Sequence, residues 1–486
     1  MTLAFPHVKL LADRRTKIVA TIGPASREPN VIEALIQAGV NVMRLNMSHA
    51  DQATHKVAYE RIRAVAETLG QPIAVMVDLT GPKIRVGHLV NGQVELVTGS
   101  HVIVTTRDVV GGPGLIPSQY KALAADVQPS DRILLDDGLI ELRVETVSGT
   151  DITCKVINGG VLKDHKGINL PGVRVSAPSL TEKDKSDARF ALELGADFLA
   201  LSFVRKPADV LELKALISEA GQSTHVIAKI EKPEALATID KIVDVADGIM
   251  VARGDLGVEL SPEEVPLAQH QLVALARAKN TPVIVATQML ESMIQNPRPT
   301  RAEVSDVSHA VFDGADAVML SAETAVGQYP VAAVQMMDRV ARQVEAFLAT
   351  DSGFRSLTEQ QEEAVPPLPL HVAVARATSQ LSRDLSVKTI VVLSRTGTTA
   401  TMMAVARPAA PIVAVTTNPG VCRRMNLLWG VVPVLVDADD FKHPQATARR
   451  VSVELKMAEP GSYLLLVAGM RADEMESTPM VTVMRV

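Results

Sequence analysis

The sequence predicts an α/β fold in which eight parallel strands close into a (β/α)8 barrel, with a small β domain inserted in the barrel and a second α/β domain after it. Three features predict this arrangement. Eight short runs rich in valine, isoleucine and alanine alternate with helical patterns. One long segment between the third and fourth runs shows strand-like alternation instead. A polar and then proline-rich segment precedes four more apolar runs.

The eight runs have the composition of parallel strands that are buried on both faces, because they are nearly continuous in apolar residues. They cover residues 17–23, 40–48, 73–79, 197–203, 225–231, 248–255, 282–290 and 317–324. Helical patterns lie between them, for example at residues 49–69, 233–245, 264–278 and 301–313. Regular alternation of this kind favours a closed TIM barrel over an open, doubly wound sheet.

The segment from Arg85 to Ala177 is rich in valine, threonine and glycine, with Asp-Gly and Asn-Gly turn signals, and it predicts a small β-barrel domain. Because it follows a barrel strand, this domain would lie over the barrel mouth as a lid that excludes water. Arg85 and Lys166, near its two ends, would then face the site below. A solvated surface charge is the alternative for each of them.

The C-terminal part has the pattern of another α/β domain. Residues 350–369 are typical of a linker. Apolar runs follow at residues 387–394, 411–417, 431–436 and 462–468, with helical patterns at 370–385 and 446–456, so a mainly parallel sheet is expected. The predicted domains are therefore the barrel at residues 1–82 and 178–350, the β lid at residues 83–177 and the C-terminal α/β domain at residues 351–486.

The composition disfavours several classes of protein. With 486 residues, 47% of them hydrophobic, and a net charge of −6, the chain has enough apolar residues for several packed domains. Aromatic residues make up 3%, so few side chains could stack on bases, and nucleic-acid binding is disfavoured. No signal region or membrane-spanning run is present, which predicts a soluble protein. Cys154 and Cys422 have no metal-binding spacing and are expected to be buried thiols in a reducing cytoplasm.

Common motifs of nucleotide-binding and hydrolytic sites are absent, since the chain has no Walker A, GxGxxG, HExxH or GxSxG pattern. Polar residues gather instead at the predicted strand ends, on the face where barrels of this kind carry their active sites. They are Arg44, Asn46, Ser48, Asp78, Lys229, Glu231, Asp255, Thr287, Gln288 and Glu323.

Two of these carboxylates and a lysine predict a divalent-cation site. Lys229 and Glu231 share one face of a strand, because side chains two residues apart point the same way. Asp255 ends the next predicted strand of the same βαβ unit. Mg²⁺ is typically held by one or two carboxylates together with substrate oxygens. A surface charge network is the alternative, and this unit alone does not separate the two. With Arg44, the set suits a dense anion such as a phosphoryl group in transfer.

Seven short motifs lie at predicted strand ends or at the ends of the lid. They are MRLNMSH at residues 43–49, DLTGPKIR at 78–85, KGINLP at 166–171, AKIE at 228–231, MVARGDLG at 250–257, ATQML at 286–290 and MLSAET at 319–324. Any one of them could arise by chance, but seven in order form a specific signature. Together they resemble the pyruvate kinase family, and the resemblance spans essentially the whole chain.

The resemblance implies phosphoryl transfer from phosphoenolpyruvate to ADP, which gives ATP and pyruvate in the last step of glycolysis. Glu231 and Asp255 would hold Mg²⁺, for which Mn²⁺ can substitute, and a second Mg²⁺ would arrive with the nucleotide. Lys229 and Arg44 would bind the phosphoryl group, and Thr287 would lie near the carbon that accepts the proton. The implied substrate-binding residues are Arg44, Lys229, Ala252, Gly254, Asp255 and Thr287, and the implied nucleotide-binding residues are Asn46, His49, Arg85 and Lys166.

One departure from the family concerns K⁺. Many relatives have a glutamate after the Gly-Pro pair of the third strand and bind K⁺ through an asparagine, a serine, an aspartate and a backbone carbonyl. The matching residues here are Asn46, Ser48, Asp78 and Leu79, but Lys83 follows the Gly-Pro pair. Because a lysine ammonium is a compact point charge, we predict that Lys83 supplies the charge that K⁺ supplies elsewhere, which would make K⁺ dispensable. The alternative is a solvent-facing Lys83 with K⁺ still bound.

The C-terminal domain has its own candidate site, SRTGTT at residues 394–399, after a predicted strand and before a helix. Backbone N–H groups at such a turn can bind a phosphate, although an ordinary helix cap is the alternative. The loop is similar to the effector-phosphate loop of allosteric pyruvate kinases, which implies a phosphorylated activator at Ser394, Arg395, Thr396, Gly397, Thr398 and Thr399.

The chain after Gly469 bears on the identity of that activator. It lacks the Gly/Ser/Thr-rich loop and the tryptophan of animal relatives that are activated by fructose 1,6-bisphosphate. A bacterial type that is activated by a sugar monophosphate or AMP is therefore predicted. The family is usually a homotetramer, and this assembly is carried over from the resemblance alone.

The residues leave two other functions open. Another Mg²⁺-dependent barrel acting on phosphoenolpyruvate or pyruvate, such as a mutase or an aldolase, would explain the carboxylates but not a lid carrying Arg85 and Lys166. A catalytically silent sugar-phosphate sensor would use the C-terminal domain alone. The presence of Lys229, Glu231 and Asp255 speaks against the sensor, because a silent relative is expected to lose some of these residues.

Overall fold

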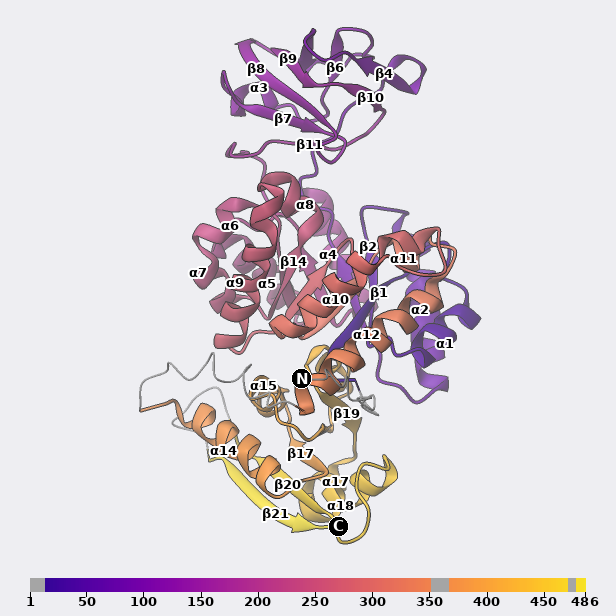
Figure 1. The fold of residues 1–486 in the computed structure, drawn as a ribbon, viewed down its shortest axis with the longest axis vertical. Helices are drawn as coiled ribbons and strands as arrows, with labels where there is room; N and C mark the ends of the chain where they lie inside the picture. The colour runs from indigo at the N-terminus through magenta and orange to yellow at the C-terminus, as the bar shows by residue number, and fades with distance from the viewer. Residues whose placement is uncertain (1–13, 351–366, 471–477) are drawn as a thin grey trace, which may run out of the picture.

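The computed structural model describes residues 14–350, 367–470 and 478–486, and three parts follow one another along the long axis of the molecule (Figure 1). The β lid lies at one end, the barrel in the middle and the C-terminal domain at the other end. The expectation about the activator depends on the chain after Gly469, of which residues 471–477 lie outside the described residues. None of the helices in the described part is long and apolar enough to cross a bilayer.

The middle part is a closed barrel of eight parallel strands, which confirms the predicted fold class. The strands are β1 (Lys17–Thr21), β2 (Val42–Asn46), β3 (Ala74–Asp78), β12 (Phe198–Leu201), β13 (His225–Ile230), β14 (Gly248–Ala252), β15 (Val283–Ala286) and β16 (Ala317–Leu320). Their order around the barrel is β1-β16-β15-β14-β13-β12-β3-β2. The lid separates β3 from β12 in the sequence, yet these strands are neighbours in the barrel. The inserted domain therefore leaves the sheet intact.

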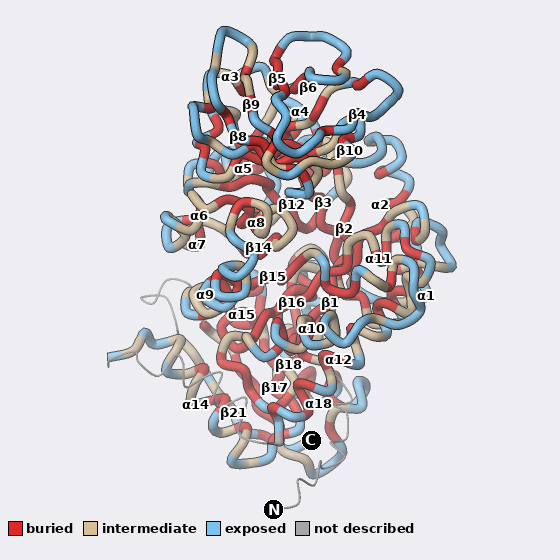
Figure 2. Tube along the Cα trace, turned by 45° about the horizontal axis from the view of Figure 1, so that its top comes forward, coloured by how far each residue is buried: buried red, intermediate tan, exposed pale blue. Residues whose placement is uncertain are grey.

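The barrel strands are buried on both faces, as Figure 2 shows by their continuous red trace. Large side chains fill the interior, among them Met76, Phe198, Ile227, Met250 and Met319. Leu427 from the C-terminal domain belongs to the same cluster. The barrel is thus a packed core that the C-terminal domain closes at one end.

All eight barrel strands end before the limits that the sequence predicted, and the early ends of β14 and β15 shape the candidate site. β14 ends at Ala252, where α8 (Arg253–Glu259) begins at once, so Asp255 lies in the first turn of a helix and not on a strand. β15 ends at Ala286, and the next two residues have positive φ angles, 68° at Thr287 and 54° at Gln288. Positive φ is incompatible with strand geometry, which is why β15 stops there.

Helices surround the barrel. They include α1 (Pro29–Gln37), α2 (Gln52–Thr68), α4 (Glu182–Leu194), α5 (Pro207–Glu219), α6 (Pro233–Ala237), α7 (Ile239–Val245), α9 (Val265–Ala278), α10 (Arg301–Asp313), α11 (Ala322–Ala325) and α12 (Pro330–Thr350). Local signals set their ends: Thr181 and Thr300 form capping boxes at the starts of α4 and α10, and Gly195 and Gly314 end these helices in the left-handed conformation.

The lid has its own apolar core and is built from β strands with one short helix, α3 (Leu123–Asp126). Its strands are β4 (Gln93–Leu96), β5 (His101–Thr105), β6 (Leu115–Pro117), β7 (Arg132–Leu135), β8 (Ile140–Ser148), β9 (Asp151–Asn158), β10 (Gly160–Lys163) and β11 (Ile168–Asn169). Six form a sheet in the order β11-β7-β8-β9-β5-β6, and β10 pairs with β4. Arg85 bridges to Gly167 beside β11, and Val86 bridges to Ser118 beside β6. Residues 85–86 thereby join the two edges of the six-stranded sheet.

The C-terminal domain is a five-stranded sheet in the order β19-β18-β17-β20-β21, flanked by helices. The strands are β17 (Thr389–Leu393), β18 (Ile412–Thr416), β19 (Val431–Leu435), β20 (Tyr463–Ala468) and β21 (Met480–Arg485), and the helices are α14 (Leu370–Asp384), α15 (Thr398–Val405), α16 (Pro419–Arg424), α17 (Ala438–Lys442) and α18 (Pro444–Glu454). The predicted parallel strands are present, and β21, which was not predicted, pairs with β20 in the antiparallel direction. Cys154 in the lid and Cys422 in α16 are buried, as expected.

Candidate active site

A polar cavity of about 260 Å³ lies between the carboxyl ends of the barrel strands and the base of the lid. It gathers residues that are far apart in sequence and come from several strand ends and both ends of the lid. The predicted site residues that line it are Arg44, Asn46, Ser48, His49, Lys83, Arg85, Lys166, Lys229, Glu231 and Asp255. Asp78, Leu79, Ala252, Gly254 and Thr287 are not among its lining residues.

Lys229 is anchored in this cavity by three oxygen atoms. Its Nζ donates to Ser202 Oγ at 2.6 Å and lies 2.9 Å from Glu231 Oε1 and 3.2 Å from Asp78 Oδ1. Burial disfavours the charged ammonium, but the two carboxylates outweigh it and raise the pKa of Lys229 above its ordinary value. The lysine is therefore a fixed positive charge at neutral pH.

Asp78 holds the two cations that face the cavity although it lies behind them. Its Oδ2 accepts from Arg44 Nε at 2.7 Å, and Arg44 Nη1 donates to Thr21 Oγ1 at 3.0 Å. Burial would raise the pKa of Asp78, but the charges of Lys229 and Arg44 prevail and lower it. Asp78 thus stays ionised and orients both cations.

Glu231 and Asp255 form the acidic side of the cavity. Glu231 is almost fully buried, and its Oε2 accepts from the backbone N–H of Phe203 at 2.7 Å. Burial raises the pKa of Glu231, the Asp255 carboxylate raises it further, and Lys229 opposes the shift. Asp255 is partly exposed, and its Oδ1 lies 3.8 Å from Lys83 Nζ. Two oxygen donors whose charges repel each other are suited to a hard divalent cation.

Thr287 lies beside Gly254 at the start of α8, in a backbone conformation that is rare for a β-branched residue. Hydrogen bonds hold it there. Gly254 N–H donates to Thr287 Oγ1 at 2.7 Å, Thr287 Oγ1 donates to Ala286 O at 2.6 Å, and Arg253 Nη2 donates to Thr287 O at 2.6 Å. Strained residues that are held in this way cluster at functional sites.

Cations from the lid complete the upper side of the cavity. Arg85 Nη1 donates to the backbone carbonyl of His165 at 3.0 Å, and Lys166 Nζ lies 2.8 Å from Asp136 Oδ1. Partial burial lowers the pKa of His49, and the nearby charge of Arg85 adds to this shift. A cavity with this excess of positive charge attracts an anion.

The residues predicted for a monovalent cation surround the same region. Ser48 N–H donates to Asn46 Oδ1 at 3.1 Å, and the Leu79 carbonyl accepts from Ser202 Oγ at 2.7 Å. Both Asp78 oxygens face cations of the protein, Arg44 on one side and Lys229 on the other. Lys83 lines the cavity together with Asn46 and Ser48, and its ammonium group forms an ion pair with Asp255.

A second cavity, of about 440 Å³, adjoins the first and shares Arg44, Asn46 and His49 with it. Its other walls come from the end of β1 and the loop after it, from α2 and the residue Ala50 before it, and from α11 with the residues on either side. Many of these residues are apolar: Ile22, Gly23, Pro24, Ala50, Ala58, Ala322, Ala325 and Val326. No local pattern of the sequence marks this cavity, because its walls come from separate βα units. It was therefore missed.

Two further site residues, Ser202 and Arg253, were also not predicted. Ser202 follows β12 and binds both Lys229 and the Leu79 carbonyl, whereas Arg253 begins α8 and pairs with Asp306 at 2.6 Å. A usable signal existed for Ser202, since it is a polar residue at the end of a predicted barrel strand.

The candidate effector loop lies between β17 and α15. Gly397 has a φ of 97°, which only glycine adopts readily, and its N–H donates to Ser394 Oγ at 3.1 Å. Thr399 Oγ1 donates to Met470 O at 3.1 Å, and the hydroxyl oxygens of Thr396 and Thr398 lie 2.9 Å apart, so Ser394, Thr396, Thr398 and Thr399 all have hydrogen-bond partners within the protein. Arg395 and Thr396 are exposed, and the Arg395 guanidinium lies 5.3 Å from the Phe441 ring centre.

A closed (β/α)8 barrel with a cation-rich cavity at the carboxyl ends of its strands defines a barrel enzyme whose site suits an anionic substrate. The family model described as "Pyruvate kinase, barrel domain" matches residues 13–334, and that described as "Pyruvate kinase, alpha/beta domain" matches residues 372–484. The chain therefore belongs to the pyruvate kinase family of transferase enzymes, which confirms the family assignment made from the motifs.

Individual relatives agree with the family models over nearly the whole chain. Pyruvate kinase 2 of Synechocystis sp. (strain PCC 6803) is 45% identical over 97% of this chain and 79% of its own length. A pyruvate kinase of Agrobacterium vitis is 43% identical over 98% of this chain and 97% of its own. The crystal structure of a pyruvate kinase from Cryptosporidium parvum superposes with a TM-score of 0.91 at 34% identity and covers 98% of both chains.

Proposed function

We propose that this chain transfers the phosphoryl group of phosphoenolpyruvate to ADP in a Mg²⁺-dependent reaction that yields ATP and pyruvate. The observation that carries the proposal is the convergence of Lys229, Arg44 and two carboxylates in one cavity beneath a lid that adds Arg85 and Lys166. Phosphoryl transfer requires mostly positioning and charge stabilisation. The reaction does not require a covalent nucleophile from the protein.

Glu231 and Asp255 would hold Mg²⁺ or Mn²⁺, since both offer carboxylate oxygen atoms to the same cavity. The bound ion supplies positive charge against the substrate oxygens. Lys229, fixed by Asp78 and Ser202, stabilises the charge of the phosphoryl group in transfer. Arg44, oriented by Asp78, binds the same group from the other side.

Thr287 belongs to the proton-transfer side of this site in our proposal. Its hydroxyl is fixed beside Gly254 by two hydrogen bonds, and Ala252 and Gly254 at the start of α8 would contact the substrate carboxylate. Because Thr287 Oγ1 already donates to a backbone carbonyl, we assign it a place in a water relay to the methylene carbon and not the role of sole proton donor.

The nucleotide is proposed to bridge the two adjoining cavities. Its phosphates would meet Asn46, His49, Arg85 and Lys166 in the polar cavity, where the positive charges gather. The base would lie in the neighbouring apolar cavity, which shares Asn46 and His49 with the polar one. This arrangement places the transferred phosphate between the nucleotide and Lys229.

We further propose that Lys83 replaces K⁺. Its ammonium lies in the cavity with Asn46 and Ser48, and Asp78 is already compensated by two protein cations. Pyruvate formation from phosphoenolpyruvate, ADP and Mg²⁺ in tetramethylammonium buffer, with and without KCl, tests both proposals. Full activity without K⁺ is expected. Activity only with K⁺ would retain the kinase and reject the role of Lys83, and no activity in either buffer, with sugar phosphates added, would reject the kinase.

The loop at residues 394–399 is proposed to bind a phosphorylated activator, either a sugar monophosphate or AMP. Thr396, Gly397 and Thr398 lie at the start of α15, where backbone N–H groups favour a phosphate, and Arg395 adds positive charge. Thr396→Ala together with Arg395→Ala is expected to abolish activation by these compounds and to leave the basal rate unchanged. We also carry over from the family a homotetramer in the cytoplasm.

A further inference from the structure

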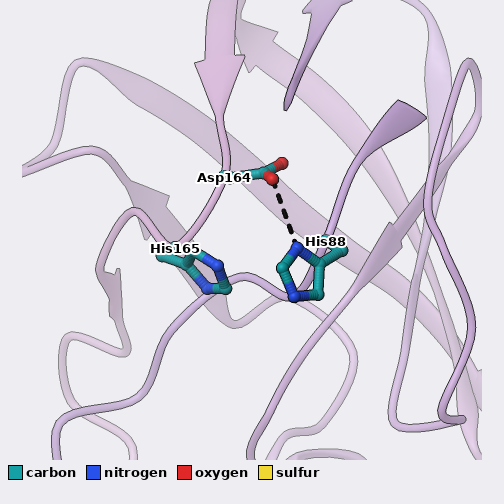
Figure 3. A group of neighbouring side chains, drawn as sticks. All are labelled: His88, Asp164 and His165. Atoms are coloured by element: carbon teal, nitrogen blue, oxygen red, sulfur yellow. Dashed lines mark hydrogen bonds and ion pairs between the residues drawn. The ribbon is translucent and has the colours of Figure 1, made fainter. Parts of the chain in front are cut away.

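Three potential metal ligands of the lid, His88, Asp164 and His165, lie together at its base (Figure 3). One donor atom of each residue lies within 4.8 Å of the donor atoms of the others. Among the residues that the structure describes, this is the one such group of three or more histidine, cysteine or acidic side chains. None of the sequence motifs assigned a function to His88 or Asp164.

The three residues come from the two segments that connect the lid to the barrel. His88 follows the segment that leads from β3 into the lid, and Asp164 and His165 follow β10 on the segment that leads out. The backbone already joins these segments, because Val86 N–H donates to Lys166 O at 2.9 Å. A ligand bound by all three side chains would link the same two segments.

The spacing of two donors fits one tetrahedral ion. His88 Nδ1 lies 3.4 Å from Asp164 Oδ2. Ligands about 2.0–2.1 Å from a tetrahedral Zn²⁺ are about 3.3–3.4 Å apart. His165 meets the His88 ring edge-on, with the ring centres 4.6 Å apart, so rotation about its side-chain bonds would bring the third donor to the ion. A water molecule would complete the coordination.

Neighbouring groups orient the proposed ligands. Asp164 Oδ1 accepts from Leu89 N–H at 2.8 Å, which leaves Oδ2 directed toward His88. The bond from Leu89 is typical of the outer contacts that hold metal-binding carboxylates. Gln119 Nε2 lies 3.1 Å from His165 Nδ1, a contact that His165 would exchange for the ion when its ring rotates. The His88 side chain is 72% exposed, so an ion can reach it from solvent.

We propose that His88, Asp164 and His165 bind a divalent transition-metal ion such as Zn²⁺ and that the bound ion restrains the base of the lid. Imidazole ligands select Zn²⁺, Co²⁺, Ni²⁺ or Cu²⁺ over Mg²⁺, which prefers oxygen donors. The site is therefore chemically distinct from the carboxylate pair of the cavity.

Restraint of the lid base at this position would weaken the binding of ADP. This consequence rests on the proposed nucleotide-binding role of Arg85 and Lys166. The His165 carbonyl accepts from Arg85, and Lys166 is the next residue, held to Asp136. An ion that fixes His165 keeps both cations on these protein partners and away from the nucleotide phosphates. A higher KM for ADP is the expected result.

Cobalt binding tests the site without reference to activity. The full chain is titrated with Co²⁺ in excess Mg²⁺, and the visible absorption of the bound ion is followed for the wild type, His88→Gln and the control His101→Gln. His101 is an exposed histidine on β5 of the same lid and lies 3.2 Å from Glu145. The wild type and His101→Gln are expected to bind equally, and His88→Gln at least about tenfold more weakly. Equal binding by His88→Gln would overturn the site.

Steady-state kinetics test the restraint. Zn²⁺ in excess Mg²⁺ is expected to raise the KM for ADP severalfold in the wild type and in His101→Gln, and to leave it unchanged in His88→Gln. The same response in all three proteins, whether a rise or no change, would overturn the effect on the lid. If the chain has no kinase activity, cobalt binding still decides whether the metal site exists.

Discussion

At the scale of single residues, the candidate site depends on the ion pairs that Asp78 forms with two cations. This aspartate contacts Arg44 through one oxygen and Lys229 through the other, and it is shielded from solvent. An ion pair of this kind is costly to bury and is strongly destabilising to break. It is therefore suited to orientation: it keeps two cations pointing at the position where phosphoryl charge would develop.

Replacement of Lys229 tests its catalytic role. Lys229→Met is expected to lower kcat by roughly 10²–10³-fold, because it removes the charge that stabilises the transition state in the proposed mechanism. Binding of phosphoenolpyruvate with Mg²⁺, measured by calorimetry, is expected to change only severalfold. Lys279→Met, which removes a partly exposed lysine at the end of α9, is the control. Turnover of Lys229→Met within tenfold of the wild type would contradict the assignment.

The raised pKa of Glu231 predicts how Mg²⁺ binding depends on pH. A carboxyl group with a raised pKa stabilises the metal-free fold below its ordinary pKa of 4.5 and loses this contribution as the pH rises through the raised value. Mg²⁺ requires the ionised form, so its affinity is expected to fall as the pH is lowered through the same window. The rise in Tm on adding Mg²⁺, measured from neutral pH down to the ordinary pKa of a glutamate, reports this. A constant rise across that range would contradict it.

At the scale of elements, strand β13 contributes an ionisable side chain to each end of the barrel. Its last residues carry Lys229 toward the cavity, and its first residue, His225, faces the base near the C-terminal domain. Burial lowers the pKa of His225 to about 4. Asp247 before β14 and Asp197 before β12 oppose this shift, whereas Arg424 of α16 and Lys214 of α5 support it. The imidazole is therefore neutral in the folded protein at neutral pH.

His225 is accordingly expected to make the fold sensitive to acid. A histidine with a lowered pKa contributes stability that is present above its ordinary value of about 6.5 and is lost as the pH falls toward about 4. His225→Gln is expected to reduce the loss of unfolding free energy between these pH values by about 2–3 kcal/mol, as measured by urea denaturation. His443→Gln, at an exposed position, is the control. Identical pH profiles for His225→Gln and the wild type would reject this role.

At the scale of the whole molecule, a buried arginine joins the C-terminal domain to the base of the barrel. Arg407 is 0% exposed, and its Nη2 donates to Asp316 Oδ1 at 2.9 Å and to Gly314 O at 2.8 Å. Its guanidinium lies 4.6 Å from the centre of the Trp429 ring. Arg407 follows α15, and Asp316 precedes β16, so this pair connects the end of α15 to the start of a barrel strand.

Removal of that arginine tests the junction. Arg407→Met is expected to lower the free energy of unfolding by about 3–5 kcal/mol, because it leaves Asp316 buried without its cation. The double variant with Asp316→Asn is expected to recover part of the loss. Arg450→Met, which removes an exposed ion pair with Asp440, is the control. A cost below about 1 kcal/mol, measured by calorimetry, would show that the pair is not needed there.

The sequence alone determined the fold class, the order of the elements and the family. Each barrel strand is a run of apolar residues that is buried on both faces, and helices such as α4 and α10 carry their own capping signals, so these features are local. The residues Lys229 and Glu231 could be paired because the strand period of two is itself local. Closure of the eight strands followed from their number and alternation.

The tertiary structure alone decided how distant residues meet. Asp78 lies behind the cavity and binds two cations, Ser202 anchors Lys229, and Arg407 reaches Asp316. None of these contacts has a sequence period, because each joins side chains from different βα units or domains. The early end of β14 at Ala252 likewise follows from the helix that begins there and puts Asp255 into its first turn. Charge, burial and backbone strain depend on such packing, which becomes fixed only when the barrel closes and the lid and C-terminal domain cover its two ends.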